Sequence, residues 1–141
     1  MPVKWNQART GRAPFMASLF LTSISLFVYE VTATRIFSPV MRYHFVFLLT
    51  SMAIFGLGVG GIIAYYRFRN FDSKQIAVYL PGWQLVLAAS YILSFSLMYK
   101  LPFIKLSIAY SLIAALPFIA GGIFISLLFR IMPENSNRLY C

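Results

Sequence analysis

Four long apolar stretches are the feature that most constrains the fold of this chain. They run over residues 15–37, 44–66, 76–99 and 106–132, with short polar joints between them. Each is long enough to cross the hydrocarbon core of a bilayer, which takes about 20 apolar residues in a helix. Only 11% of the residues are charged, against roughly 25% in a soluble domain. The sequence therefore predicts an all-α, polytopic membrane protein with four transmembrane helices.

The transmembrane domain is expected to span residues 15–132, between a basic N-terminal tail (1–14) and a polar C-terminal tail (133–141). The first stretch is about twice as long as the apolar core of a signal peptide, and it contains Glu30 and Arg35. We interpret it as a permanent span. Pro14 suits the first turn of a helix because its missing N–H costs nothing there, so the first helix is expected to begin near this residue.

The net charge of +9 is distributed as in a membrane protein. An even number of spans places both termini on one side, and eight basic residues belong to that side: Lys4, Arg9, Arg12, Arg67, Arg69, Lys74, Arg130 and Arg138. The other side carries Arg35, Arg42, Lys100 and Lys105. Lysines and arginines in short loops stay in the cytoplasm during insertion. Both termini are therefore predicted to be cytoplasmic, close to anionic lipid headgroups, and nucleic acid is not an expected partner.

Small residues line two faces of the second apolar stretch. Gly56, Gly60 and Ala64 repeat at every fourth position, which places them on one helical face where a neighbouring backbone can approach closely. A second set falls on another face: Ser51, Gly58 and Gly61. Two close neighbours are expected, so this helix is predicted either to be central in the bundle or to receive a helix from a partner protein.

Prolines and glycines mark the last two stretches. Pro81 favours a kink or an irregular first turn in the third helix, and Asp72 is suited to cap that helix. In the fourth helix Pro117 removes a helical hydrogen bond, so the carbonyl that it frees must be satisfied by a neighbour inside the membrane. Two further helix-packing positions follow it: Gly121 and Gly122.

Glu30 is the strongest candidate for a functional residue, because an ionisable group within a span costs at least roughly 2.5 kcal/mol unless it is paired or hydrated. Its depth corresponds to about Thr50 or Ser51 in an antiparallel neighbour. The favoured interpretation is structural: Glu30 accepts hydrogen bonds from one of these hydroxyls or from His44, and so fixes a hairpin of the first two helices. Proton or ion handling and contact with a partner or cofactor stay open as alternatives.

Arg35 and His44 are expected to lie at the same depth, near the extracytoplasmic surface. Arg35 is five positions after Glu30, about 140° around the helix, so the two are not natural partners within one helix. His44 is the only histidine, and we interpret it as a hydrogen-bonding residue at the membrane surface. Axial ligation of a haem or a chlorophyll-type pigment is the weaker alternative, since bis-ligated haem needs a second strong ligand.

No catalytic residue, metal site or cofactor is predicted. The chain has one cysteine, Cys141, so it offers no internal disulfide and no zinc cluster. Residues 56–61 resemble a dinucleotide loop only superficially, because such a loop must follow a strand and begin a helix. The hydroxyls of Thr50 and Ser51 lack an accompanying acid–base pair. We therefore do not expect the chain to be an enzyme.

One region resembles a known family. The segments that carry the resemblance are Val28-Tyr29-Glu30, Thr34-Arg35-Ile36-Phe37-Ser38, Tyr43-His44-Phe45 and Gly56-Leu57-Gly58. Together they are similar to the N-terminal membrane region of bacterial spermidine-synthase-like integral membrane proteins, over about residues 19–65. The resemblance implies a family in which a soluble aminopropyltransferase-like domain follows the membrane helices. This sequence ends at Cys141 without that domain, which implies a fragment of a longer polypeptide or a shortened relative kept as a membrane subunit.

Three functions are expected from these observations. The first is a non-catalytic accessory or structural subunit of a larger bacterial membrane complex, with energy-transducing complexes among the candidates. The second is the membrane-anchoring part of a spermidine-synthase-like enzyme, and the third is a small transporter or proton-handling unit that uses Glu30. The expected partners are other integral membrane subunits and anionic lipids, and the expected location is the bacterial cytoplasmic (inner) membrane.

Overall fold

Helices make up almost all of the chain that the computed structural model describes, which is residues 5–37, 44–100 and 107–131. They are α1 (Trp5–Phe37), α2 (His44–Phe68), α3 (Ser73–Lys100) and α4 (Ser107–Ile131). All four are long and apolar enough to cross a membrane. This confirms an all-α chain with four candidate spans, whereas the cytoplasmic position of the termini stays a prediction. The predicted joint at 38–43, the predicted joint at 100–105 apart from Lys100, and the C-terminal tail lie outside the described residues.

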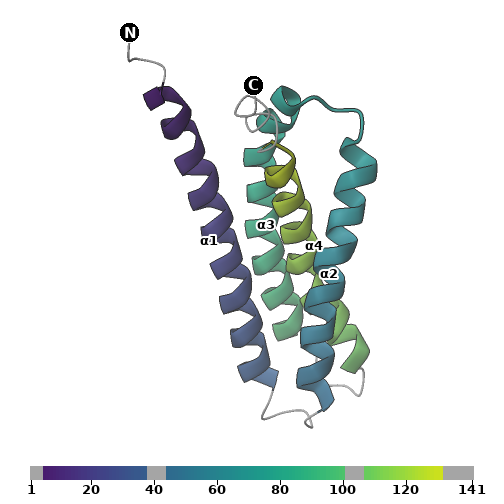
Figure 1. Cartoon of the computed structure of the whole chain (residues 1–141). Helices are drawn as coiled ribbons and strands as arrows, with labels where there is room; N and C mark the ends of the chain where they lie inside the picture. The colour runs from purple at the N-terminus through teal and green to yellow at the C-terminus, as the bar shows by residue number, and fades with distance from the viewer. Residues whose placement is uncertain (1–4, 38–43, 101–106, 132–141) are drawn as a thin grey trace.

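The helices alternate in direction along the chain, so the start of α1 and the end of α4 lie at the same end of the bundle (Figure 1). The end of α2 and the start of α3 lie there too. Six basic residues lie in or next to these helix ends: Arg9, Arg12, Arg67, Arg69, Lys74 and Arg130. We call this end of the bundle the basic end.

The central helix is α4. It packs against each of the other helices, and Figure 1 shows it between α2 and α3. Its apolar span is 61% buried, whereas those of α2 and α3 are 28% and 11% buried. The prediction of a central second helix is therefore wrong, because α2 packs mainly against α4 and less extensively against α1. Small buried side chains or glycines on α4 allow this close approach: Ala114, Ala115, Ala120, Gly121 and Gly122.

None of the prolines in the described helices marks the end of a helix. Helix α1 begins at Trp5 and contains Pro14, so the predicted start near Pro14 is wrong. Helices α3 and α4 likewise run through Pro81 and Pro117. A proline removes one hydrogen bond but does not end a membrane helix if another group satisfies the carbonyl that it frees.

Asp72 lies at the N-cap of α3, as predicted. Its carbonyl accepts the first helical hydrogen bond from the Ile76 amide at 3.0 Å, and its own amide donates to Gln75 Oε1 at 3.2 Å. The second bond is one half of a capping box, in which the side chain at the third helical position accepts a hydrogen bond from the main-chain N–H of the N-cap residue. The joint between α2 and α3 is therefore short and well defined.

Candidate functional site

Pro117 leaves a main-chain carbonyl at the centre of the bundle without its helical hydrogen bond. Proline has no N–H, so the carbonyl of Ile113, four residues earlier, has no donor within α4. Ser94 of α3 supplies one, with a distance of 3.0 Å from Ser94 Oγ to Ile113 O. This confirms the expectation that a neighbouring helix satisfies the carbonyl freed by Pro117.

The Ser94 hydroxyl also receives a hydrogen bond from α1. Tyr29 Oη lies 2.6 Å from Ser94 Oγ. Because Ser94 gives its single proton to Ile113 O, Tyr29 is the donor in this bond. The two side chains are only 4% and 0% exposed. Tyr29, Ser94 and the Ile113 carbonyl thus form what we call the central hydroxyl chain, which joins three helices.

A second contact of the same kind lies one helical turn away. Tyr91 Oη and Ser25 Oγ are 2.9 Å apart, and Ser25 donates to the Thr22 carbonyl at 2.9 Å, so Tyr91 is the donor to Ser25. The rings of Tyr29 and Tyr91 pack against each other with centroids 5.3 Å apart. Aromatic packing and the paired hydroxyl contacts therefore fix α1 against α3.

Glu30 does not make the predicted contact with α2. Thr50 and Ser51 are exposed, so the predicted clasp between Glu30 and these hydroxyls is wrong. The buried face of α1 is formed by residues three or four positions apart: Thr22, Leu26, Tyr29 and Ala33. Glu30 follows Tyr29 by about 100° around the helix and is partly buried. Its charge made Glu30 the candidate for a functional residue, but Tyr29 is the residue that faces the other helices.

The other two polar candidates of this region lie apart from the central hydroxyl chain. Arg35 is exposed near the end of α1. His44 begins α2, and its side chain lies outside what the structure describes, so its predicted hydrogen bond with Glu30 stays a prediction. Within the described part of the chain, no hydrogen bond or ion pair is seen for Glu30.

Replacing Glu30 with glutamine is expected to leave the stability of the isolated chain unchanged within about 0.5 kcal/mol, or to raise it slightly. Removal of an unpaired ionisable group lowers the cost of placing this helix in lipid. The measurement is unfolding of the purified protein by a denaturing detergent. Tyr29→Phe at the adjacent position should by contrast destabilise the chain, because Ser94 loses its donor. A large loss of stability in Glu30→Gln would reveal a partner such as His44.

The main chains of α2 and α4 are in close contact at three glycines. A Cβ added at Gly60 would lie 2.9 Å from the Ile123 nitrogen, and one at Gly56 would lie 2.8 Å from Phe118 Cβ. From the other side, a Cβ at Gly122 would lie 3.0 Å from Leu57 Cα. Real Cβ atoms do not come this close to other atoms. A side chain at any of the three positions would therefore push the two helices apart, and glycine allows them to stay in contact.

The remaining small residues have different surroundings. Ala64 is buried in an apolar cluster with Phe68. A Cβ at Gly121 would lie 2.7 Å from a methyl group of Leu26, so this glycine receives α1. A Cβ at Gly61 would meet only Ser126 Oγ, at 3.3 Å, and one at Gly58 would have no neighbour within 4 Å. Gly58 therefore packs against none of the described helices, and its role in helix packing stays a prediction.

The interior offers hydroxyl groups and a carbonyl. Among the described residues, no three side chains of histidine, cysteine, aspartate or glutamate lie close enough to hold a metal ion. Tyr91, Ser25 and Ser94 were not predicted from the sequence to be functional residues. The usable signal was Pro117, because a search for hydroxyl side chains at the depth of Ile113 would have found Ser94.

Comparisons with protein-family models, with curated proteins and with solved structures found no match to this chain. The resemblance to spermidine-synthase-like membrane proteins therefore stays a prediction from the residues that carry it.

Proposed function

We propose that this chain is a non-catalytic helical subunit of a larger membrane assembly, and that the outer face of α2 receives a helix of another integral membrane protein. The observation that carries the proposal is Gly58. It is exposed, and a Cβ built on it would meet no atom within 4 Å. Ser51, about two turns earlier in the helix, is exposed as well and shares this face.

A glycine on the surface of a membrane helix needs a physical reason. It costs roughly 1 kcal/mol relative to alanine within a helix, and against lipid it gains no contact in return. Against another helix it allows the two main chains to approach closely, as Gly60 already does on the opposite face of α2. The hydroxyl of Ser51 would add a hydrogen-bonding group to such a contact.

Glu30 gives further support. It is a partly buried acid with no partner in the described part of the chain, and an unpaired carboxyl inside a membrane is costly. A neighbouring subunit with a donor at this depth would satisfy it. The large apolar surfaces of α1 and α3 suit lipid and protein equally well, so they do not distinguish a partner protein from the bilayer.

The proton-handling alternative at Glu30 has less support. A proton path needs a continuous series of hydrogen-bonding groups, and among the described residues no hydrogen bond leads from Glu30, which lies outside the central hydroxyl chain.

Gly58→Leu is expected to remove a stoichiometric companion protein from the chain while the chain itself stays folded. An overpacked contact costs about 1–3 kcal/mol, which corresponds to roughly a fivefold to hundredfold loss of affinity. The measurement is the intact mass of the complex extracted from native membranes in mild detergent.

The matched control is Gly82→Leu, because Gly82 of α3 also has no neighbour within 4 Å of an added Cβ. This variant should keep the companion. A monomeric wild-type chain, or a companion retained equally by both variants, would contradict the proposed interface.

A further inference from the structure

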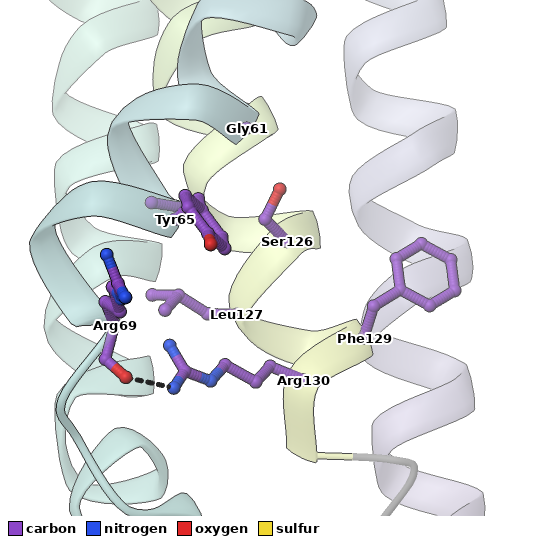
Figure 2. Close-up of a pocket in the computed structure, with 8 residues that line it drawn as sticks. Gly61, Tyr65, Arg69, Ser126, Leu127, Phe129 and Arg130 are labelled. Atoms are coloured by element: carbon purple, nitrogen blue, oxygen red, sulfur yellow. Dashed lines mark hydrogen bonds between the residues drawn. The ribbon is translucent and has the colours of Figure 1, made fainter.

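A pocket of about 570 Å³ opens between the last turns of α2 and α4, at the basic end of the bundle (Figure 2). Its wall combines two arginines, two hydroxyl side chains and apolar or small residues: Arg69, Arg130, Tyr65, Ser126, Leu127 and Gly61. The pocket lies apart from the central hydroxyl chain, because none of the residues of that chain lines it.

Arg130 is held in place at the pocket. It reaches from α4 to the end of α2 (Figure 2) and donates to the main-chain carbonyls of Phe68, of Arg69 at 2.8 Å and of Phe71 at 3.4 Å. The last carbonyls of a helix have no donor within the helix, so Arg130 caps α2. A guanidinium carries more N–H groups than these bonds use, and the remaining ones are available to a ligand.

The pocket has an excess of positive charge. Arg69 brings a second guanidinium, whereas the C-terminal end of α2 offsets only about half a charge. None of the described acidic residues lines the pocket. The guanidinium of Arg69 and the N–H groups that Arg130 has left can donate to the oxygens of a phosphate group.

The depth of the pocket matches the position of lipid phosphates. The apolar spans of α2 and α4 end at Phe68 and Ile131, beside Arg69 and Arg130. Farther from the basic end than Arg130, Leu127 and Gly61 continue the wall into the apolar part of the bundle (Figure 2). A ligand that fits this arrangement has an anionic head and apolar chains.

We propose that this pocket binds the phosphate headgroup of an anionic phospholipid, with Arg69 and Arg130 on the phosphate and the acyl chains along α2 and α4. Basic pockets between membrane helices bind such headgroups. Gly61 keeps the pocket open, because any side chain longer than a methyl group at this position would extend from beside Ser126 into the cavity. Gly58 and Gly61 lie on the same face of α2, so the lipid headgroup would lie next to the partner helix proposed at Gly58.

The test is native mass spectrometry of the purified protein titrated with phosphatidylglycerol and, in parallel, with phosphatidylcholine. Arg69→Gln is expected to weaken phosphatidylglycerol binding about fivefold, the effect of roughly 1 kcal/mol for one arginine at the membrane surface. Arg67→Gln is the matched control, since Arg67 is exposed, two positions away and outside the pocket. This control should bind like the wild type.

Gly61→Leu fills the pocket without changing its charge, and it should weaken binding at least as much as Arg69→Gln. Size-exclusion chromatography and circular dichroism establish that this variant is folded, and Arg69→Gln gives an independent result if it is not. The proposal is overturned if Arg67→Gln weakens binding as much as Arg69→Gln, since the effect is then diffuse surface charge. It is also overturned if phosphatidylcholine binds equally well, or if inorganic phosphate binds as tightly as the lipid.

Discussion

Gly60→Leu is expected to destabilise the protein by more than about 3 kcal/mol, a large part of the roughly 5–15 kcal/mol that stabilises a typical domain. The added side chain would meet the main chain of α4 at Ile119, Gly122 and Ile123. Main-chain atoms of a buried helix cannot rotate away as a flexible side chain can. The two helices must therefore separate, and the most extensive contact of the bundle is lost.

Gly58→Leu is the matched control for this experiment. It introduces the same side chain two residues earlier in the same helix, where an added Cβ meets no atom within 4 Å. In the isolated chain it should raise stability by up to about 1 kcal/mol, because leucine has a higher helix propensity than glycine and meets no obstacle here. Unfolding in denaturing detergent can be followed by the fluorescence of Trp83, whose ring lies 6.1 Å from that of Phe68 in α2. Equal losses in the two variants would show that α2 does not face α4 through Gly60.

Ser94→Ala is expected to destabilise the protein by about 1–2 kcal/mol. The substitution leaves the Ile113 carbonyl and the Tyr29 hydroxyl without partners, and an unsatisfied buried group costs about 1–3 kcal/mol. A hydrogen bond between membrane helices contributes about 0.6 kcal/mol on average. Because Ser94→Ala removes two such bonds, about 1 kcal/mol is the lower end of the expected loss. Ser90→Ala is the control, because the Ser90 hydroxyl donates within its own helix to Leu87 O at 2.6 Å.

Pro117→Ala tests the reason for this cost. Alanine restores the N–H that Ile113 O lacks, so Ser94→Ala should cost less in the Pro117→Ala background than in the wild type. The difference between the two costs, measured as a double-mutant cycle, isolates the coupling between Ser94 and Pro117. A cycle with no coupling would mean that Ser94 acts through packing and not through the freed carbonyl.

The sequence predicted the elements of this fold well, because length and hydropathy decide where a membrane helix can form. It also predicted that Pro117 would need a donor from another helix, since the loss of an N–H is a local property of proline. The close approach of α2 at Gly56 and Gly60 follows the same kind of local rule, because small residues spaced by four positions share one face.

The arrangement of the helices could not be predicted in the same way. In lipid, residues that face the core and residues that face the bilayer are equally apolar, so periodicity does not indicate which side of a helix is buried. Both faces of α2 carry small residues, and only the structure distinguishes Gly60, against α4, from Gly58, with open space. Tyr29 shows the same difficulty. The sequence does not reveal that its hydroxyl is buried, and the charge of the neighbouring Glu30 made that residue the candidate.

Photo-crosslinking from position 55 in native membranes tests the proposed function most directly. A benzophenone side chain introduced in place of Phe55, an exposed aromatic residue one turn before Gly58, reports what lies against the open face of α2 and leaves Gly58 unchanged. The same group in place of Val78, an exposed residue of α3, serves as reference. We expect position 55 to give one protein adduct of fixed mass that is lost when the partner dissociates in harsh detergent. Adducts with lipid alone at position 55, as at position 78, would show that this face meets the bilayer and would contradict the proposed function.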